Sequence, residues 1–243
     1  MALADLLYVA YFAAIGPLID YWILWPAHSR RAQADPTRAR VRLWAWSMSA
    51  WVVVAVGVAL WMGYGRSWED FGFSLPDGWR SWTFIALVVL LAAYYALGAR
   101  SIVRNAETRA SVRQQAETVA ALMPHTRREM YWWTGVSLTA GFCEEFLFRG
   151  YFIWVFAAWL GWWGAAALSL LIFAGWHAYQ GWYGVLRTGI FGAIYTLAVA
   201  AFDSLWPAIA LHALTDIGSG AMAWLALREP EPTIQNCALP IEN

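Results

Sequence analysis

Apolar residues are arranged along the chain in seven long runs that shorter polar segments separate. A helix needs about 20 apolar residues to cross a hydrocarbon core of about 30 Å, and the runs approach or reach that length. The pattern therefore predicts an all-α, polytopic membrane helix bundle of about seven transmembrane helices, or eight if one more segment is buried or re-entrant. The runs lie near residues 4–25, 43–62, 81–99, 131–156, 163–180, 185–202 and 205–227.

The polar segments carry arginine unevenly. Of the 16 arginines, 13 lie in segments that share one side of a seven-helix bundle, while Arg66 and Arg80 lie on the other side and Arg149 lies within a run. Because cytoplasmic loops carry an excess of basic residues, we expect the N-terminus outside and the C-terminus in the cytoplasm. We expect residues 1–227 to form a single helical membrane domain, and the proline-containing, aperiodic residues 228–243 to form a disordered cytoplasmic tail.

Composition supports the same class of protein. The chain is 61% apolar and 13% charged, whereas an ordinary soluble domain is about 25% charged, so a typical soluble enzyme is excluded. Acidic and basic residues number 16 each and leave no broad basic face, so we expect membrane lipid and no nucleic acid as a partner. All basic residues are arginine and 19 residues are tryptophan, which suits a GC-rich genome and predicts a bacterial cytoplasmic membrane.

Ionisable residues within the apolar runs mark a candidate site. A charge near the bilayer centre costs at least about 2.5–3.5 kcal/mol, so each needs a reason to be there. One such residue alone can serve as a polar contact between helices, but six on three runs predict a functional site in the segment of about residues 130–220. The six are Glu144, Glu145, Arg149, His177, His212 and Asp216.

Helical spacing divides these residues into units. Glu145 and Arg149 stand at i and i+4 and form a pair that satisfies itself. Glu144 is rotated by about 100° from Glu145, so it needs a partner from another helix, for which His177 and His212 are available. His212 lies four residues before Asp216, so these two side chains project from one helix face as a second polar unit.

The residue types favour hydrolysis. A carboxylate and an imidazole that share one water can remove its proton as it attacks a carbonyl, while the other polar unit faces the developing oxyanion. No cofactor is expected, but Glu144, His177 and His212 would also make a His₂Glu zinc set with an open position. Outside the candidate site, Asp5 and Asp20 are expected at a helix cap or at the lipid interface.

Three motifs in order resemble those of the CAAX protease and bacteriocin-processing (CPBP, or Abi) family of intramembrane proteases, which includes the type II CAAX prenyl endopeptidases. E-E-x-x-x-R matches Glu144, Glu145 and Arg149, F-x-x-x-H matches Phe173 and His177, and H-x-x-x-N or H-x-x-x-D matches His212 and Asp216. The motifs cover about two fifths of the chain, and Ser204-Leu205-Trp206-Pro207-Ala208 precedes the last one.

The resemblance implies a glutamate-dependent intramembrane endopeptidase. In such an enzyme Glu144 and His177 would activate water, and His212 with its partner at position 216 would polarise the scissile carbonyl. The substrate would be a membrane-associated protein or peptide, either a lipidated CAAX-type protein cut near its C-terminus or a leader-bearing peptide. Prenyl-processing members carry asparagine at the last position, so Asp216 departs from their pattern and must act as a protonated acid or by orienting His212.

Two other function classes remain open from the residues alone. Intramembrane acids and histidines also mark proton-coupled transporters, although the polar residues here lie in one half of the chain, without a matching set in the other. A non-catalytic immunity or scaffold protein is the other class. A packing role should survive Glu144→Gln, whereas a catalytic role should not.

Overall fold

The computed structural model describes residues 1–228, apart from the side chain of Thr118, and every regular element in that range is a helix. From residue 229 on, the predicted tail lies outside the described residues. The elements are α1 (Leu3–Ala10), η1 (Tyr11–Ile15), α2 (Gly16–Ile19), η2 (Asp20–Leu24), α3 (Trp25–Ala34), α4 (Pro36–Ser47), α5 (Ala50–Gly63), α6 (Trp68–Phe71), α7 (Gly78–Arg104), α8 (Ala106–Ala116), η3 (Glu117–Val119), α9 (Arg127–Glu144), η4 (Glu145–Phe152), α10 (Ile153–Trp176), η5 (Ala178–Gln180), α11 (Gly181–Phe202) and α12 (Leu205–Leu227).

The seven apolar runs all lie in helical segments, so the predicted all-α class is confirmed. Five segments are long and apolar enough to span a membrane, and the fourth of these is broken into two helices, with α12 as a further long helix. These counts agree with about seven helices. The five segments are Leu3–Ala34, Pro36–Gly63, Gly78–Arg104, Arg127–Trp176 and Ala178–Phe202.

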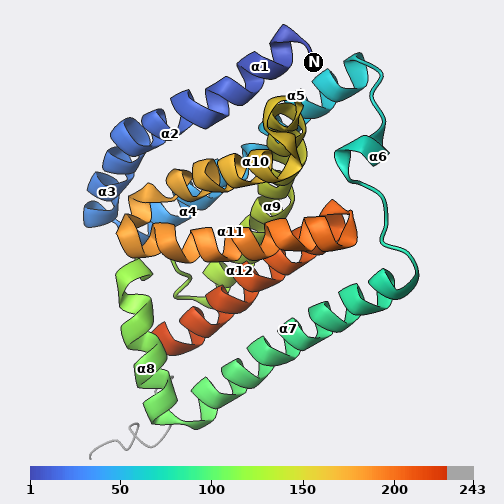
Figure 1. The fold of residues 1–243 in the computed structure, drawn as a ribbon. Coiled ribbons are helices and arrows are strands. Elements are labelled where there is room, and N and C mark those ends of the chain that lie inside the picture. The colour runs from blue at the N-terminus through green and yellow to red at the C-terminus, as the bar shows by residue number, and fades with distance from the viewer. Residues whose placement is uncertain (229–243) are drawn as a thin grey trace, which may run out of the picture.

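The break in the fourth segment occurs at Gly161. Its φ of 65° and ψ of 172° belong to a region of backbone space that side chains with a Cβ rarely adopt. Beyond this residue α10 turns back alongside η4 (Figure 1), so the 50-residue stretch supplies two adjacent helices to the bundle. The sequence predicts this break in the gap between the runs ending at residue 156 and starting at residue 163.

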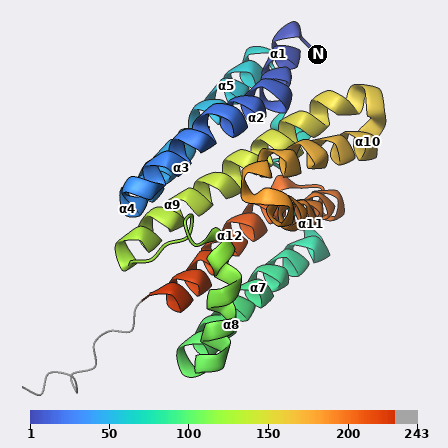
Figure 2. The same cartoon turned by 90° about the vertical axis from the view of Figure 1, so that its left-hand side faces the viewer.

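Polar contacts identify the two ends of the bundle. At one end Arg40 pairs with Glu129 at 2.7 Å, which joins the starts of α4 and α9, and Arg109 of α8 donates to the carbonyl of Ala226. At the other end the backbone N–H of Leu205 donates to the carbonyl of Gly72 at 2.8 Å. The connection between α3 and α4 and the helix α8, which carry many of the arginines, lie towards one end of the helices (Figure 2).

The outer helices present apolar side chains to their surroundings. Of the 27 residues of α7, Ile102 is the buried one, and Leu90 and Leu97 are among its exposed large side chains. A helix with an apolar exposed face is stable when lipid covers that face. The chain is accordingly an integral membrane protein.

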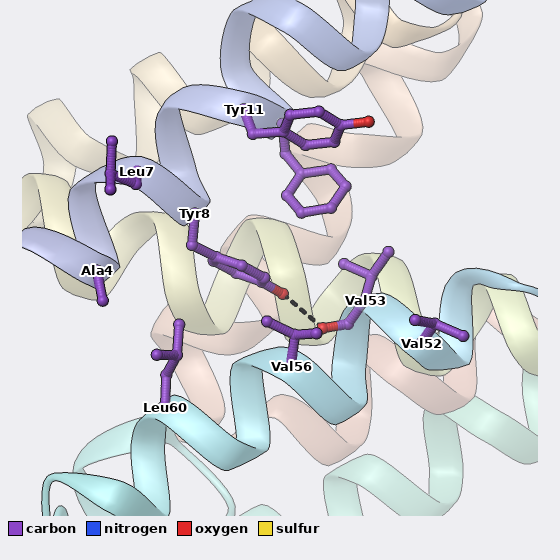
Figure 3. Close-up of a pocket in the computed structure, with 9 residues that line it drawn as sticks. Ala4, Leu7, Tyr8, Tyr11, Val52, Val53, Val56 and Leu60 are labelled. Carbon is purple, nitrogen blue, oxygen red and sulfur yellow. Dashed lines mark hydrogen bonds between the residues drawn. The ribbon is translucent and has the colours of Figure 1, made fainter.

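An apolar groove of about 410 Å³ lies between α1–η1 and α5 (Figure 3). The hydroxyl of Tyr8 donates to the carbonyl of Val53 across its floor at 2.9 Å. Apart from tyrosine hydroxyls its lining offers no ionisable group, so it supplies no catalytic chemistry. The lining residues are Ala4, Leu7, Tyr8, Tyr11, Phe12, Val52, Val53, Val56 and Leu60.

Candidate active site

The candidate site lies where α9 passes into η4, against α10, α11 and α12. Glu144 is the last residue of α9, and Glu145 is the first residue of η4, which is a π-helix. Such segments within α-helices occur frequently at functional sites. The sequence predicts a plain α-helix here, and the π-helical turn is a difference that hydropathy alone does not signal.

A buried network lies beneath the site. The Glu145 side chain is fully buried, and its Oε1 accepts from Nη1 of Arg149 at 3.0 Å and from Nδ1 of His212 at 2.8 Å. Arg149 also donates to the carbonyl of Gly192 at 2.9 Å and to the hydroxyl of Thr196 at 3.3 Å. The predicted pair is present, but the separation into two units is wrong, because His212 bonds to Glu145 across the helices.

Glu144 and Asp216 occupy the open side of the same histidine. Their side chains are 31% and 34% exposed, while His212 is 7% exposed. Nε2 of His212 lies 3.8 Å from Oε2 of Glu144 and 3.6 Å from Oδ2 of Asp216. These distances exceed a direct hydrogen bond and suit a small group that bridges the polar atoms. The two adjacent glutamates thus face different surroundings, as the 100° rotation predicts.

Aromatic rings fix the orientation of the charged groups. The imidazole of His212 stacks on Tyr195 with ring centroids 4.7 Å apart and 17° between the planes. The guanidinium of Arg149 lies 4.2 Å from the centre of the Phe173 ring. The Phe173 and His212 rings lie at 88° to each other with their centroids 6.3 Å apart. A cation above an aromatic face is electrostatically favourable, so Phe173 stabilises Arg149 besides filling space.

His177 follows the last residue of α10 and joins the site through Phe173. Its Nδ1 lies 2.9 Å from the Phe173 carbonyl, and the two rings lie 5.1 Å apart. Because a carbonyl only accepts, this nitrogen carries the hydrogen and leaves Nε2 of a neutral His177 as an acceptor. Within residues 1–228 His177 forms no ion pair with Glu144, whose ion-pair partner is His212 instead.

The alternative zinc set is not assembled. Among the described residues no group of three or more histidine, cysteine, aspartate or glutamate side chains is arranged to hold a metal ion. Glu144, His177 and His212 therefore do not fit a zinc site with this geometry.

Close helix contacts hold α9 and α12 together at the site. A Cβ at Gly141 would lie 2.8 Å from the Cβ of Ala213 and 2.9 Å from its backbone nitrogen. Glycine therefore allows the two backbones to approach, as small residues do in membrane bundles. This approach places Glu144, one turn further along α9, within reach of His212.

A second buried charged cluster lies at the end of the bundle that carries few arginines. Asp5 is fully buried and accepts from Nη1 and Nη2 of Arg66 at 2.8 and 2.6 Å and from the hydroxyl of Tyr151 at 2.5 Å. Asp5 also accepts from the backbone N–H of Ala2, so the expected helix cap is present. The Asp5 carboxylate raises the pKa of Arg66 above its ordinary value.

Sequence reasoning misses three supporting residues on α11. Gly192 and Thr196 accept from Arg149, and Tyr195 stacks on His212. A threonine and a tyrosine are unremarkable in an apolar run, so no local pattern distinguishes them. The available signal is the buried arginine itself. The guanidinium of Arg149 has five N–H donors, more than the Glu145 carboxylate alone can accept from, so further acceptors must lie nearby.

Comparisons with known proteins agree with the motifs. Residues 126–218 match the family model described as type II CAAX prenyl endopeptidase Rce1-like. No curated protein and no solved structure matches the chain. The match contains all six candidate residues and supports a CAAX-type intramembrane protease in general. Over residues 126–218, the chain is therefore similar to the CAAX protease-like family that this model describes.

Proposed function

We propose that this protein is an intramembrane endopeptidase of the CPBP type that uses Glu144 to activate water. The observation that carries the proposal is the pairing of two adjacent acids with opposite surroundings. Glu145 is fully buried and bonded to Arg149 and His212, whereas Glu144 is partly exposed and close to the free edge of the same imidazole. A carboxylate held beside a fixed histidine and open to the outside suits a general base.

In the proposed reaction Glu144 takes one proton from a water molecule as the water oxygen bonds to the scissile carbonyl carbon. Nε2 of His177 is a second acceptor for hydrogens of that water. The tetrahedral intermediate then collapses, the C–N bond breaks, and the proton returns to the leaving nitrogen. Glu144 thus serves first as base and then as acid.

His212 and Asp216 are proposed to face the carbonyl oxygen. Nδ1 of His212 is held by Glu145, so the imidazole presents Nε2 to the site, and its imidazolium form donates from that nitrogen. Asp216 lies 3.6 Å from Nε2. As a protonated acid it donates to the oxyanion, and this takes the place of the amide of an asparagine. Arg149 and Glu145 act as positioning residues that hold His212.

The substrate is proposed to be a membrane-associated protein or peptide, either lipidated near its C-terminus or bearing a leader. His177 follows the end of α10, and two residues later the ring of Tyr179 lies 4.7 Å from that of Trp25 in α3, the helix that carries Arg30 and Arg31, so His177 lies towards the arginine-rich end of the bundle. With the orientation from the positive-inside rule, that end faces the cytoplasm of a bacterium. We therefore propose that substrates enter from the cytoplasmic side.

The test is cleavage of peptides by protein purified in detergent, with products identified by mass spectrometry. Peptides with a prenylated C-terminal CAAX sequence and unprenylated leader peptides are compared, with and without a chelator. Glu144→Ala and the nearly isosteric Glu144→Gln should abolish the product, while Glu107→Gln, at an exposed position of α8, should not. Cleavage that survives Glu144→Ala would contradict the role of Glu144 as the base. An absence of product from every peptide would favour the scaffold or immunity class. Loss of product with chelator alone would favour zinc.

A further inference from the structure

An arginine outside the predicted site lies beside it. Arg187 stands in the second turn of α11, its side chain is exposed, and it reaches the side chain of Gln180, which lies three residues after His177. Among the described residues Arg187 forms no ion pair, and its hydrogen bond is a long one, 3.4 Å from Nη2 to the side-chain oxygen of Gln180. Because no acid among residues 1–228 forms an ion pair with this cation, it is available to an anion from outside.

Side-chain hydrogen bonds through Gln180 connect Arg187 to Tyr179, which lies next to His177 of the site. The Gln180 side chain folds across Gly184, where an added Cβ would lie 2.3 Å from the Cβ of Gln180, so the glycine makes room for it. From there Gln180 accepts from Arg187 and donates to the Tyr179 hydroxyl at 3.0 Å. The Tyr179 ring lies 6.1 Å from that of His177.

A hollow of about 370 Å³ opens beside the same segment. Three aromatic side chains from η2 and α3 line it together with Pro26, Ala178, Tyr179 and Gly181. The hollow has room for apolar side chains. The hydrogen-bonded side chains of Tyr179, which lines the hollow, and Gln180 lead from there to Arg187. A recess lined by aromatic rings, close to a guanidinium that forms no ion pair within residues 1–228, is complementary to the end of a peptide, which carries side chains and a carboxylate.

We propose that Arg187, supported by Gln180, binds a carboxylate of the peptide substrate. This inference rests on the proposed endopeptidase function, because the carboxylate would belong to the part of the substrate that is released. The guanidinium offers a planar pair of N–H donors that matches a carboxylate, and such charge-assisted hydrogen bonds are the strong ones. The terminal carboxylate and an acidic side chain share this chemistry. The site would fix the distance between the bound carboxylate and the bond that Glu144 cleaves.

The test compares three peptides of one sequence: a free C-terminal acid, the C-terminal amide, and an amide with glutamate as its last residue. Cleavage is measured as kcat/KM in vesicles of zwitterionic phosphatidylcholine. We expect the free acid to exceed the amide by about 10- to 100-fold, the range for one charge-assisted hydrogen bond. Arg187→Gln should bring this ratio close to one through KM, Arg187→Lys should restore part of it, and the control Arg104→Gln, at the same end of the bundle, should keep the wild-type ratio.

Binding provides a readout that does not need catalysis. The Glu144→Ala protein is titrated with the free-acid and amide peptides and followed by tryptophan fluorescence, and Arg187→Gln should remove the preference. Recovery with the glutamate peptide assigns the carboxylate to a side chain and still supports the site. Three results would overturn the inference. They are an unchanged ratio of kcat/KM between the free-acid and amide peptides in Arg187→Gln, an equal loss of kcat/KM for all three peptides, and an effect that appears only in anionic vesicles. Failure of cleavage with the binding preference intact would contradict the proposed function alone.

Discussion

Glu145→Ala should strongly destabilise the protein, whereas Glu144→Ala should leave it stable and inactive, although the two residues are neighbours. Glu145 is fully buried, and its carboxylate is the acid that compensates the buried guanidinium of Arg149 and holds Nδ1 of His212. Glu145→Ala leaves Arg149 in the interior without its acid. Glu144 is 31% exposed and its contact with His212 is 3.8 Å, so its removal leaves no buried charge unpaired.

The magnitudes follow from burial. Removing one partner of a buried ion pair costs about 3–5 kcal/mol, because an uncompensated charge stays in a low dielectric. Removing a partly exposed carboxylate changes stability by about 0–1 kcal/mol. For a chain of this size each kcal/mol shifts the unfolding temperature by about 2–4 °C, so Glu145→Ala should lower it by roughly 6–20 °C and Glu144→Ala by only a few degrees.

The assay is thermal unfolding of detergent-purified protein, followed by tryptophan fluorescence, beside peptide cleavage at a temperature where each variant is folded. Glu145→Ala should unfold early, and Glu144→Ala should be stable and inactive. Glu145→Gln, which keeps the volume, should fall between wild type and Glu145→Ala in stability. Equal unfolding temperatures for the two alanine variants, or a larger loss for Glu144→Ala, would refute the division of roles between the two acids.

Substitutions at three further positions, Asp216, Asp5 and Gly141, test other parts of the structure. Asp216→Asn should retain cleavage, since the amide donates a hydrogen bond as the protonated acid does. Asp216→Ala should lower kcat by about 10²–10³-fold. An inactive Asp216→Asn protein would contradict the oxyanion role. Asp5→Asn should lower the free energy of unfolding by about 3 kcal/mol because the guanidinium of Arg66 loses its acid, and thermal melts that coincide with wild type would contradict this. Gly141→Val should push apart α9 and α12 at a cost of about 1–3 kcal/mol with loss of activity, whereas Gly63→Ala, where a Cβ meets open space, should change neither property.

The sequence predicts the helices because their cause is local. A run of about 20 apolar residues must satisfy its own backbone hydrogen bonds in lipid, so length and hydropathy alone predict a helix. The separation of Glu144 from Glu145 is equally local, since it follows from the rotation between consecutive helical residues. The break at Gly161 lies in the interval between two apolar runs, and the positive φ of the glycine is its physical cause.

Contacts between helices could not be predicted because they depend on the register of one helix against another. The bond from His212 to Glu145 joins residues 67 positions apart, and the pair of Arg66 with Asp5 spans 61 positions. Hydropathy says which residues are costly to bury but not which partner removes the cost. Spacing therefore predicts pairs within one helix, whereas the link between the two pairs depends on how α12 packs against η4.

The order of the two glutamates explains how one continuous helical segment would supply both the buried support and the proposed base. Consecutive helical residues point in different directions, so one carboxylate can lie in the protein interior while the next faces an opening. The interior carboxylate can be buried only because Arg149, four residues on, compensates it, and it then holds His212 in place. A chain with Glu145 and Arg149 but without Glu144 would keep this support and lack the base. Protease and scaffold would then differ by one partly exposed carboxylate, which makes Glu144 the residue that discriminates between these two functions.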